Sequence, residues 1–403
     1  MNLIISPLNG AAKSSRAHDP GASRLVVAPS FERLKTLGIV LGTALFSLSL
    51  VAAPSVAVRD ALNSLRAVGP LGQGTAAAQA AVKQLANEPA SVLPEVLKAM
   101  DGANDYALNW LRAVVDSLSS KPGTQLPASE LQHFIGNKEH HPRARRLAYE
   151  LLQRSDAAAA SKLLPSFLND PSNELRRDAV AEELNKASQA LAQSKKDDAT
   201  QIYQVALKNA RDVDQIEAAA KALRELGQAV DLQKTFGWVT RWKLVAPFDN
   251  IGGAGFEKAF TPEQNPDLAA EYDAQVGKAS WKDYSTKSEY GLVSFNEPYT
   301  ALKGVGGYAQ TDFYSDRERD VEIRLGCKNA WKLWVNGQLL FGRDEYHRGA
   351  EIDQYRIKTR LKSGKNLILV KCLQNEQKEE WTVEWEFQLR VTDAQGTPIV
   401  SAQ

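Results

Sequence analysis

The sequence predicts a multidomain α + β protein, in which an N-terminal α-solenoid of helical repeats precedes an antiparallel β-sandwich. Residues 58–232 predict the helices, because they are rich in Ala, Leu, Gln, Lys and Glu and carry apolar residues at helical spacing. Residues 236–403 predict the strands, because short runs there alternate apolar and polar side chains and hold seven of the eight tryptophans. With 403 residues, 43% of them hydrophobic, the chain is long enough to bury one core in each domain.

The charges of the chain nearly cancel, since 49 basic and 48 acidic residues leave a net charge of +1. Such a balance gives no general attraction to nucleic acid or anionic lipid, so nucleic acid is not an expected partner. The chain contains no nucleophile elbow, no His-Glu-x-x-His pair and no Walker loop, and its five histidines lack metal-ligand spacing. We therefore expect no catalytic residues, cofactor or metal site, and a protein that is not an enzyme.

Residues 1–57 are typical of a leader that carries a signal peptide. The last basic residue is Lys35, and an apolar core without charges then runs from 37 to 53. Small residues follow up to Ala57, where a signal peptidase would need them, so we expect cleavage there and export to the periplasm or the medium. The alternative is an uncleaved membrane anchor, because an apolar run of this length is only slightly short of a spanning helix. Contact with a membrane is expected only in that case.

A pattern centred on an alanine recurs in the helical region. The alanines Ala113, Ala148, Ala179 and Ala219 are separated by 35, 31 and 40 residues, and basic side chains precede most of them. This spacing predicts a unit of two helices, with the small residue where neighbouring helices approach closely.

The run 170–180, Asp-Pro-Ser-Asn-Glu-Leu-Arg-Arg-Asp-Ala-Val, resembles the second helix of a HEAT repeat. Asp170 is expected to cap that helix, with Pro171 near its first turn. The resemblance covers about residues 90–230, and a tetratricopeptide-like array is the alternative. Either array implies a curved surface for a protein partner and no chemistry of its own.

Strand signals are clearest near the C-terminus. Residues 381–391 alternate strictly, which predicts a strand with Trp381, Trp385 and Phe387 in the core. The dipeptide Asn336-Gly337 separates two apolar runs and predicts a tight hairpin. A further turn and buried strand are expected over 361–372.

The order of these signals resembles the galactose-binding-like jelly-roll modules of exported bacterial proteins, over about residues 236–400. Its landmarks are a Pro-Phe-Asp-Asn corner at 247–250, Gly252 to Phe256 followed by Thr261-Pro-Glu263, the strand 331–337 with its Asn-Gly turn, Gly364 to Val370, and the closing segment 385–398. The resemblance implies a β-sandwich used for carbohydrate binding, for protein contact or as a spacer. Such modules often have an acidic, glycine-containing turn where this chain has 327–330, which puts a ligand or calcium site at that turn in doubt.

Binding of a saccharide would need an exposed aromatic ring with planar polar groups nearby. Trp334 is the first candidate, because Leu333 and Val335 occupy the opposite phase of its strand; the alternative is that both faces of the sheet are covered. The remaining candidates, each of which could instead be ordinary surface, are Trp281, Tyr284, Arg343, Glu345 and His347.

The chain has two cysteines, Cys327 and Cys372, and each ends a strand-like run on its apolar phase. The two side chains could therefore be adjacent. A disulfide and a pair of buried free thiols are both compatible with this pattern.

These observations together predict an exported, non-catalytic binding or scaffold protein. Its helical repeats would contact a protein partner and its sandwich would bind a glycan. The alternatives are an accessory component of a carbohydrate-active enzyme system and a purely structural protein of the envelope.

Overall fold

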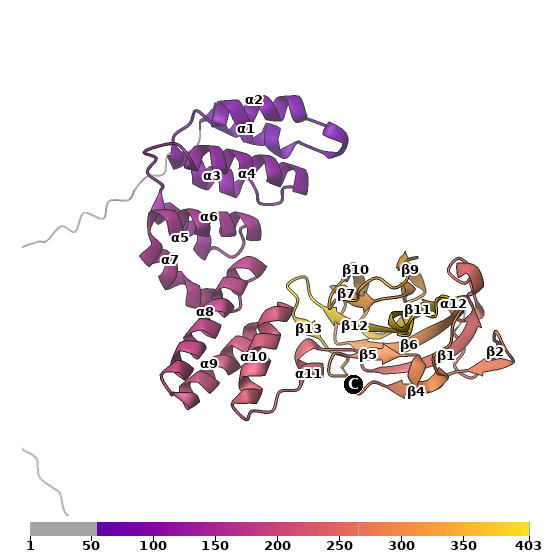
Figure 1. The fold of residues 1–403 in the computed structure, drawn as a ribbon. Helices are drawn as coiled ribbons and strands as arrows, with labels where there is room; N and C mark the ends of the chain where they lie inside the picture. The colour runs from indigo at the N-terminus through magenta and orange to yellow at the C-terminus, as the bar shows by residue number, and fades with distance from the viewer. Residues whose placement is uncertain (1–54, 265, 403) are drawn as a thin grey trace, which may run out of the picture. The chain divides into compact units, whose positions relative to one another are not determined.

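A computed structural model describes residues 55–264 and 266–402, so the apolar core of the leader at 37–53 lies outside the described residues. The described residues belong to one compact unit. Helices occupy the chain up to Phe236 and strands occupy it from Arg241 onwards, which confirms the α + β class (Figure 1). We call residues 55–236 the helical part and residues 237–402 the sheet part. None of the described helices combines the length and the apolar character that crossing a membrane requires.

The helical part is a succession of short helices that pack on their neighbours in sequence. The predicted cleavage point after Ala57 falls in the first turn of the first helix. The helices are α1 (Val56–Arg66), α2 (Thr75–Leu85), α3 (Leu93–Lys98), α4 (Asp105–Ser119), α5 (Ala128–Gly136), α6 (Pro142–Ser155), α7 (Ala157–Leu163), α8 (Asn173–Ala192), α9 (Lys196–Asn209), α10 (Val213–Glu225) and α11 (Leu232–Phe236), with 3₁₀ turns at Pro70–Gly72, Ala90–Val92 and Leu164–Phe167.

Three of the four repeat alanines are buried where the spacing places them. Ala148, Ala179 and Ala219 are each at most 1% exposed. Ala113 is exposed instead, because α4 turns the face that carries Leu111 and Leu118 towards the core. The first copy of the repeat was therefore read in the wrong helical phase.

The prediction that Asp170 caps α8 is wrong. The N-cap of α8 is Ser172, whose hydroxyl accepts from the backbone N–H of Leu175. Asp170 is fully buried and accepts two hydrogen bonds from the Arg145 guanidinium, at 2.6 and 2.8 Å. A buried arginine needs such a bidentate partner, and this requirement outweighs the local capping preference of the aspartate.

Further ion pairs join helices that are distant in sequence. Arg146 on α6 pairs with Asp178 on α8, and Arg177 on α8 pairs with Asp214 on α10. In both Arg-Arg pairs, at 145–146 and 176–177, the second arginine thus binds a carboxylate of a later helix. These ion pairs link successive helical units.

The sheet part contains two main sheets and a small two-stranded one. The first has the order β4-β1-β6-β11-β8-β9, the second has the order β10-β7-β12-β13 with β5 also paired to β12, and every pairing is antiparallel. The strands are β1 (Arg241–Asp249), β2 (Glu271–Asp273), β3 (Lys278–Ser280), β4 (Lys282–Ser285), β5 (Leu292–Ser294), β6 (Val305–Ser315), β7 (Arg319–Cys327), β8 (Ala330–Val335), β9 (Gln338–Arg343), β10 (Tyr355–Leu361), β11 (Gly364–Gln374), β12 (Glu386–Thr392) and β13 (Pro398–Ile399), with short helices α12 (Thr261–Gln264) and α13 (Asn296–Tyr299).

The predicted hairpin and the predicted buried strand are both present. Asn336 and Gly337 connect β8 to β9, with positive φ angles of 52° and 80° as a tight hairpin turn requires. The two main sheets share one hydrophobic core, to which both contribute large side chains, among them Trp331, Phe313, Trp385 and Phe387.

The last long strand is shorter than predicted. β12 begins at Glu386, and residues 380–382 form a 3₁₀ turn instead. Trp385 and Phe387 are fully buried, as expected, whereas Trp381 is 60% exposed. The hydroxyl of Thr382 explains the turn, because it donates to the carbonyls of Gln377 and Glu379 and so binds the chain to the loop before it.

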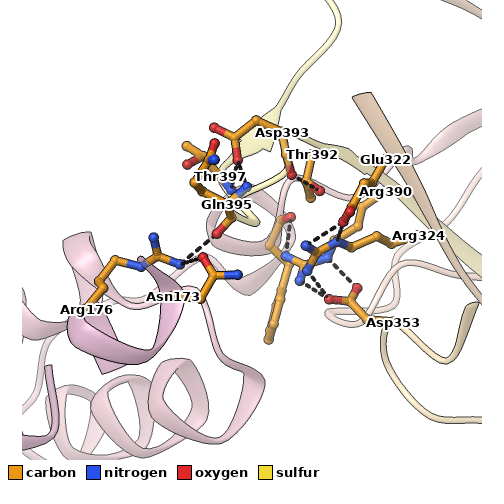
Figure 2. A network of polar contacts seen from close by, with 11 residues as sticks. Asn173, Arg176, Glu322, Arg324, Asp353, Arg390, Thr392, Asp393, Gln395 and Thr397 are labelled. Carbon is orange, nitrogen blue, oxygen red and sulfur yellow. Dashed lines mark hydrogen bonds and ion pairs between the residues drawn. The ribbon is translucent and has the colours of Figure 1, made fainter. Parts of the chain in front are cut away.

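The polar face of β12 is buried as well, because a cluster of charged side chains lies on it (Figure 2). Asp353 accepts from Arg390 at 2.7 and 2.5 Å and from Arg324 at 2.7 Å. Arg390 also donates to the carbonyl of Phe236, the last residue of α11. We call Asp353, Arg324 and Arg390 the arginine–aspartate cluster. It attaches the end of the helical part to the second sheet.

Burial alone would raise the pKa of Asp353, but the hydrogen bonds and charge of Arg390, together with the charge of Arg324, outweigh burial and lower it. The carboxylate therefore stays ionised in the folded protein throughout the neutral range.

The two cysteines are adjacent, as their strand phases suggested. Their sulfur atoms lie 3.8 Å apart between β7 and β11, and both side chains are buried free thiols. Burial, and next the neighbouring Cys327, raise the pKa of the Cys372 thiol well above its ordinary value. The Cys372 thiol is therefore protonated at neutral pH.

We expect Asp353→Asn to lower the free energy of unfolding by about 3–5 kcal/mol at pH 7, because it leaves the buried Arg390 without a counter-charge and leaves Arg324 with Glu322 alone. Urea unfolding followed by circular dichroism would measure this. Asp320→Asn is the matched control, since that aspartate is 83% exposed and pairs with an exposed arginine.

The folded-state pKa of Asp353 is lower than its unfolded value of about 3.9, so the stabilisation is present above pH ~4. It is lost as the pH falls through the lower folded-state value. The stability gap between wild type and Asp353→Asn should therefore close only in that acidic range. An equal effect of both substitutions would contradict this assignment of the cluster.

Protein purified without reductant should show two reactive thiols per chain in denaturant and almost none under native conditions, because both sulfurs are buried. Colorimetric thiol titration measures both counts. A count of zero in denaturant, restored to two by a reductant, would show that the disulfide forms instead.

Candidate functional site

Trp334 does not offer the exposed ring that saccharide stacking needs. Its side chain points away from the core between the sheets, as its phase predicts, but it is only 7% exposed. The chain between β1 and β4 covers this face of the first sheet, and its side chains pack with those of the sheet in a second, outer cluster. The buried members of that cluster are Val245, Phe248, Tyr272, Ala279, Tyr308, Trp334 and Leu369.

A buried ion pair attaches this covering segment. Glu263 on α12 lies 2.6 Å from the Nζ of Lys371, which is fully buried on β11 and also donates to the carbonyl of Lys258. Burial lowers the pKa of Lys371, while Glu263 acts in the opposite direction. The covering segment therefore pairs with a charged side chain and buries apolar ones on the outer face of the first sheet. This face is not free to bind a ligand.

Trp281 and Tyr284 do not form one site. Trp281 packs against the outer cluster, with its indole N–H 3.1 Å from the carbonyl of Asp267. Tyr284 packs against the core between the sheets instead. The two rings therefore lie on opposite faces of the first sheet, and both serve packing.

Arg343 is the last residue of β9, and Glu345 and His347 lie in the connection between β9 and β10. Arg343 and Glu345 form an ion pair at 2.7 Å. His347 reaches the connection between β11 and β12, where its Nε2 lies 2.7 Å from Oδ1 of Asn375. Its ring also meets the ring of Trp381 edge-on, with centroids 5.6 Å apart. We use the name loop cluster for five residues: His347, Asn375, Trp381, Tyr346 and Asn250.

Trp381 is the exposed ring that the sequence prediction placed in the core. It is 60% exposed, the largest exposed fraction of any tryptophan among the described residues. Lys303 fixes the turn that carries Trp381, because its Nζ donates to the carbonyl and hydroxyl oxygens of Thr382 at 2.7 and 3.0 Å. The base of the tryptophan is thus fixed while its ring faces solvent.

Asn250 supports the loop cluster from inside. Its side chain is fully buried and donates to the hydroxyl of Tyr346 at 2.9 Å and to the carbonyl of Gln374 at 3.1 Å. Its amide oxygen accepts from the backbone N–H of Gly255. One asparagine therefore ties its own loop to the β9–β10 loop and to the end of β11. Burial raises the pKa of Tyr346 to about 12, so its phenol is neutral under ordinary conditions.

His347 adopts an unusual backbone conformation, with a φ angle of +54°. Non-glycine residues rarely occupy this region, and such residues gather at functional sites. The conformation directs the imidazole towards Asn375 and Trp381, where its contacts hold it.

Planar polar side chains lie on the same connection between β11 and β12 as the exposed ring. Asn375 donates to the amide oxygen of Gln377 at 3.0 Å, and Glu376 accepts from the backbone N–H of Gly252. Amide, imidazole and carboxylate groups beside an exposed indole can contact the hydroxyl groups of a sugar whose apolar face covers the ring.

A hollow on another surface of the sheet part has a different chemistry. It measures about 550 Å³, lies over β7 and β10, and is lined by charged residues such as Asp320, Lys358 and Arg360 without any aromatic ring. Within the described ranges 55–264 and 266–402, no group of three or more His, Cys, Asp or Glu side chains is arranged to hold a metal ion.

Sequence reasoning named His347, Arg343 and Glu345 as candidates in one polar segment, but it placed Trp381, whose ring meets that of His347, in the core. The alternation from 381 to 391 favoured a strand throughout. The polar run 375–380 directly before it could have assigned Trp381 to the loop, because six polar residues cannot belong to a buried strand. Nothing in the sequence signals that this loop meets the β9–β10 loop.

No family model matches this chain, and no curated protein matches it either. The function therefore has to be inferred from the site itself.

We expect Trp334→Ala to lower the free energy of unfolding by about 3–5 kcal/mol, because it leaves a cavity in the outer cluster. Trp381→Ala should cost much less, since most of that ring is already in water. Chemical denaturation of both variants measures the difference. Equal losses would contradict the burial of Trp334 or the exposure of Trp381.

Proposed function

We propose that this protein is a non-catalytic binding protein whose sheet part holds a saccharide at the loop cluster. The observation that carries the proposal is the exposed ring of Trp381 beside His347 and Asn375, on a turn that the rest of the protein supports. A pyranose ring has an apolar face that would cover the indole, and its hydroxyl groups would contact the polar side chains at the edge.

The arrangement of the sheets supports the finer proposal of a galactose-binding-like jelly roll. Six antiparallel strands in one sheet and five in the other enclose a common core. In sandwiches of this kind the loops at the sheet ends are free to vary and to bind, because the faces are committed to packing.

The helical part supports a second element of the proposal, a HEAT-like α-solenoid that contacts a protein partner. Its helices pack in sequence order, and ion pairs such as Arg177–Asp214 link successive units. Stacks of this kind use their extended surface for recognition and supply no chemistry. The proposal also includes export to the periplasm or the medium, which only the sequence of residues 1–57 supports.

The test is glycan-array binding of the full chain, followed by calorimetric titration with the best saccharide. We expect Trp381→Ala to lower the affinity at least about tenfold, which corresponds to about 1.4 kcal/mol. Phe341→Ala is the matched control, because that ring is also exposed, at 44%, but lies on β9 outside the loop cluster. It should leave the affinity unchanged.

Equal effects of both substitutions, or binding that survives Trp381→Ala, would contradict the site. Absence of binding to any glycan would remove the saccharide proposal and favour a structural protein of the envelope. Binding to a glycan that a separate hydrolase degrades would identify the alternative, an accessory component of a carbohydrate-active enzyme system.

A further inference from the structure

A small cavity lies where the helical part meets the turn between β12 and β13. Its volume is about 60 Å³. A water molecule needs roughly 10–15 Å³ by this measure, so the cavity has room for about four waters or one small polyatomic ion. Four arginines line it against two aspartates, and the lining residues are Asn173, Arg176, Arg211, Asp212, Val213, Arg324, Asp353, Arg356, Gln395 and Gly396.

Arg176 is the central positive charge of this cavity. It is 3% exposed, and its terminal nitrogens donate to the carbonyls of Asp170 and Gln395 and to the side chain of Asn173 (Figure 2). All of these acceptors are neutral. The buried Nε has no hydrogen-bond partner among the described residues. The side chain thus keeps a donor and an uncompensated charge in a place where both are costly.

Arg211 adds a second uncompensated charge. Its guanidinium donates to the backbone carbonyls of Lys208 and Ala210 and lies 3.4 Å from the hydroxyl of Thr397. Within the described part of the chain, no carboxylate lies within ion-pair distance of Arg176 or Arg211. Burial lowers the pKa of both arginines, and the charge of Arg211 lowers that of Arg176 further. The charge of Asp393 acts on both in the opposite direction without outweighing burial.

The nearby carboxylates already have partners. Asp353 belongs to the arginine–aspartate cluster, and Asp212 lies 3.5 Å from Arg177. Asp393 accepts from the backbone N–H groups of Gln395 and Thr397, at 2.9 and 2.7 Å. Val213, at the N-terminus of the 13-residue helix α10, adds the positive end of a helix dipole to the same cavity.

We propose that this cavity binds a small oxyanion such as phosphate or sulfate, held between Arg176 and Arg211. The ion would accept from the free Nε of Arg176, neutralise the excess positive charge and bridge helices α8 and α10 to the β12–β13 turn. The volume excludes a nucleotide or a saccharide, so this site is separate from the loop cluster and does not rest on the proposed function.

The test is isothermal titration of the full chain with inorganic phosphate at constant ionic strength, together with melting temperatures in phosphate, sulfate and chloride. We expect one phosphate per chain and a higher melting temperature in phosphate than in chloride. Arg211→Gln should weaken phosphate binding at least tenfold, and Arg211→Lys should restore part of it. The control is Arg360→Gln, an exposed arginine of the sheet part that should bind phosphate like wild type.

Two results would overturn the proposal. One is an absence of binding heat with equal melting temperatures in phosphate and chloride. The other is a phosphate effect of the same size in wild type, Arg211→Gln and Arg360→Gln, which would be a general salt effect. Circular dichroism of each variant at the titration temperature shows that loss of binding does not come from loss of folding.

Discussion

The carboxylate of Asp353 joins parts of the chain that are distant in sequence. It lies in the β9–β10 loop, yet it neutralises arginines on β7 and β12, and one of these also binds the last carbonyl of α11. A buried charge cluster adds less to stability than an apolar core of the same size, but breaking it is expensive and it accepts only one geometry. The position of the helical part at the second sheet, and the path of the loop that carries His347, both depend on this interaction.

The coverage of the sheet faces determines where a ligand can bind. The inner faces form the common core, the outer face of the first sheet is closed by the α12 to β3 segment, and the polar side of β12 is used by the arginine–aspartate cluster. The rim of loops and the charged hollow over β7 and β10 remain, and only the rim offers an exposed tryptophan among the described residues. The loop cluster lies there on a rigid base, since Asn250 and Lys303 leave little freedom to the turns below Trp381.

The local patterns predicted most of the fold correctly. Helical spacing, the strand alternation after Trp385 and the Asn336-Gly337 turn each depend on neighbours in sequence, and the structure confirms all three. The errors concern side chains whose partners are distant in sequence. Asp170 looked like a cap because Arg145 could not be seen beside it, and Trp334 looked exposed because the covering segment has no strong pattern of its own. The site was found in part, because loop residues are recognisable one by one but their meeting is a property of the tertiary fold.

The contacts between the helical part and the β12–β13 turn have a consequence for the order in which the chain can fold. Arg390 reaches the carbonyl of Phe236 across 154 residues, and Arg176 reaches the carbonyl of Gln395 across 219. Helices with mainly local contacts form early, during synthesis or directly after it, whereas pairings this distant must wait for the end of the chain. Until β12 and β13 arrive, the last helices carry exposed arginines and an unfinished apolar edge. A chaperone that accompanies this chain would therefore be needed at α8 to α11 rather than at the first helices, which are complete long before the C-terminus appears.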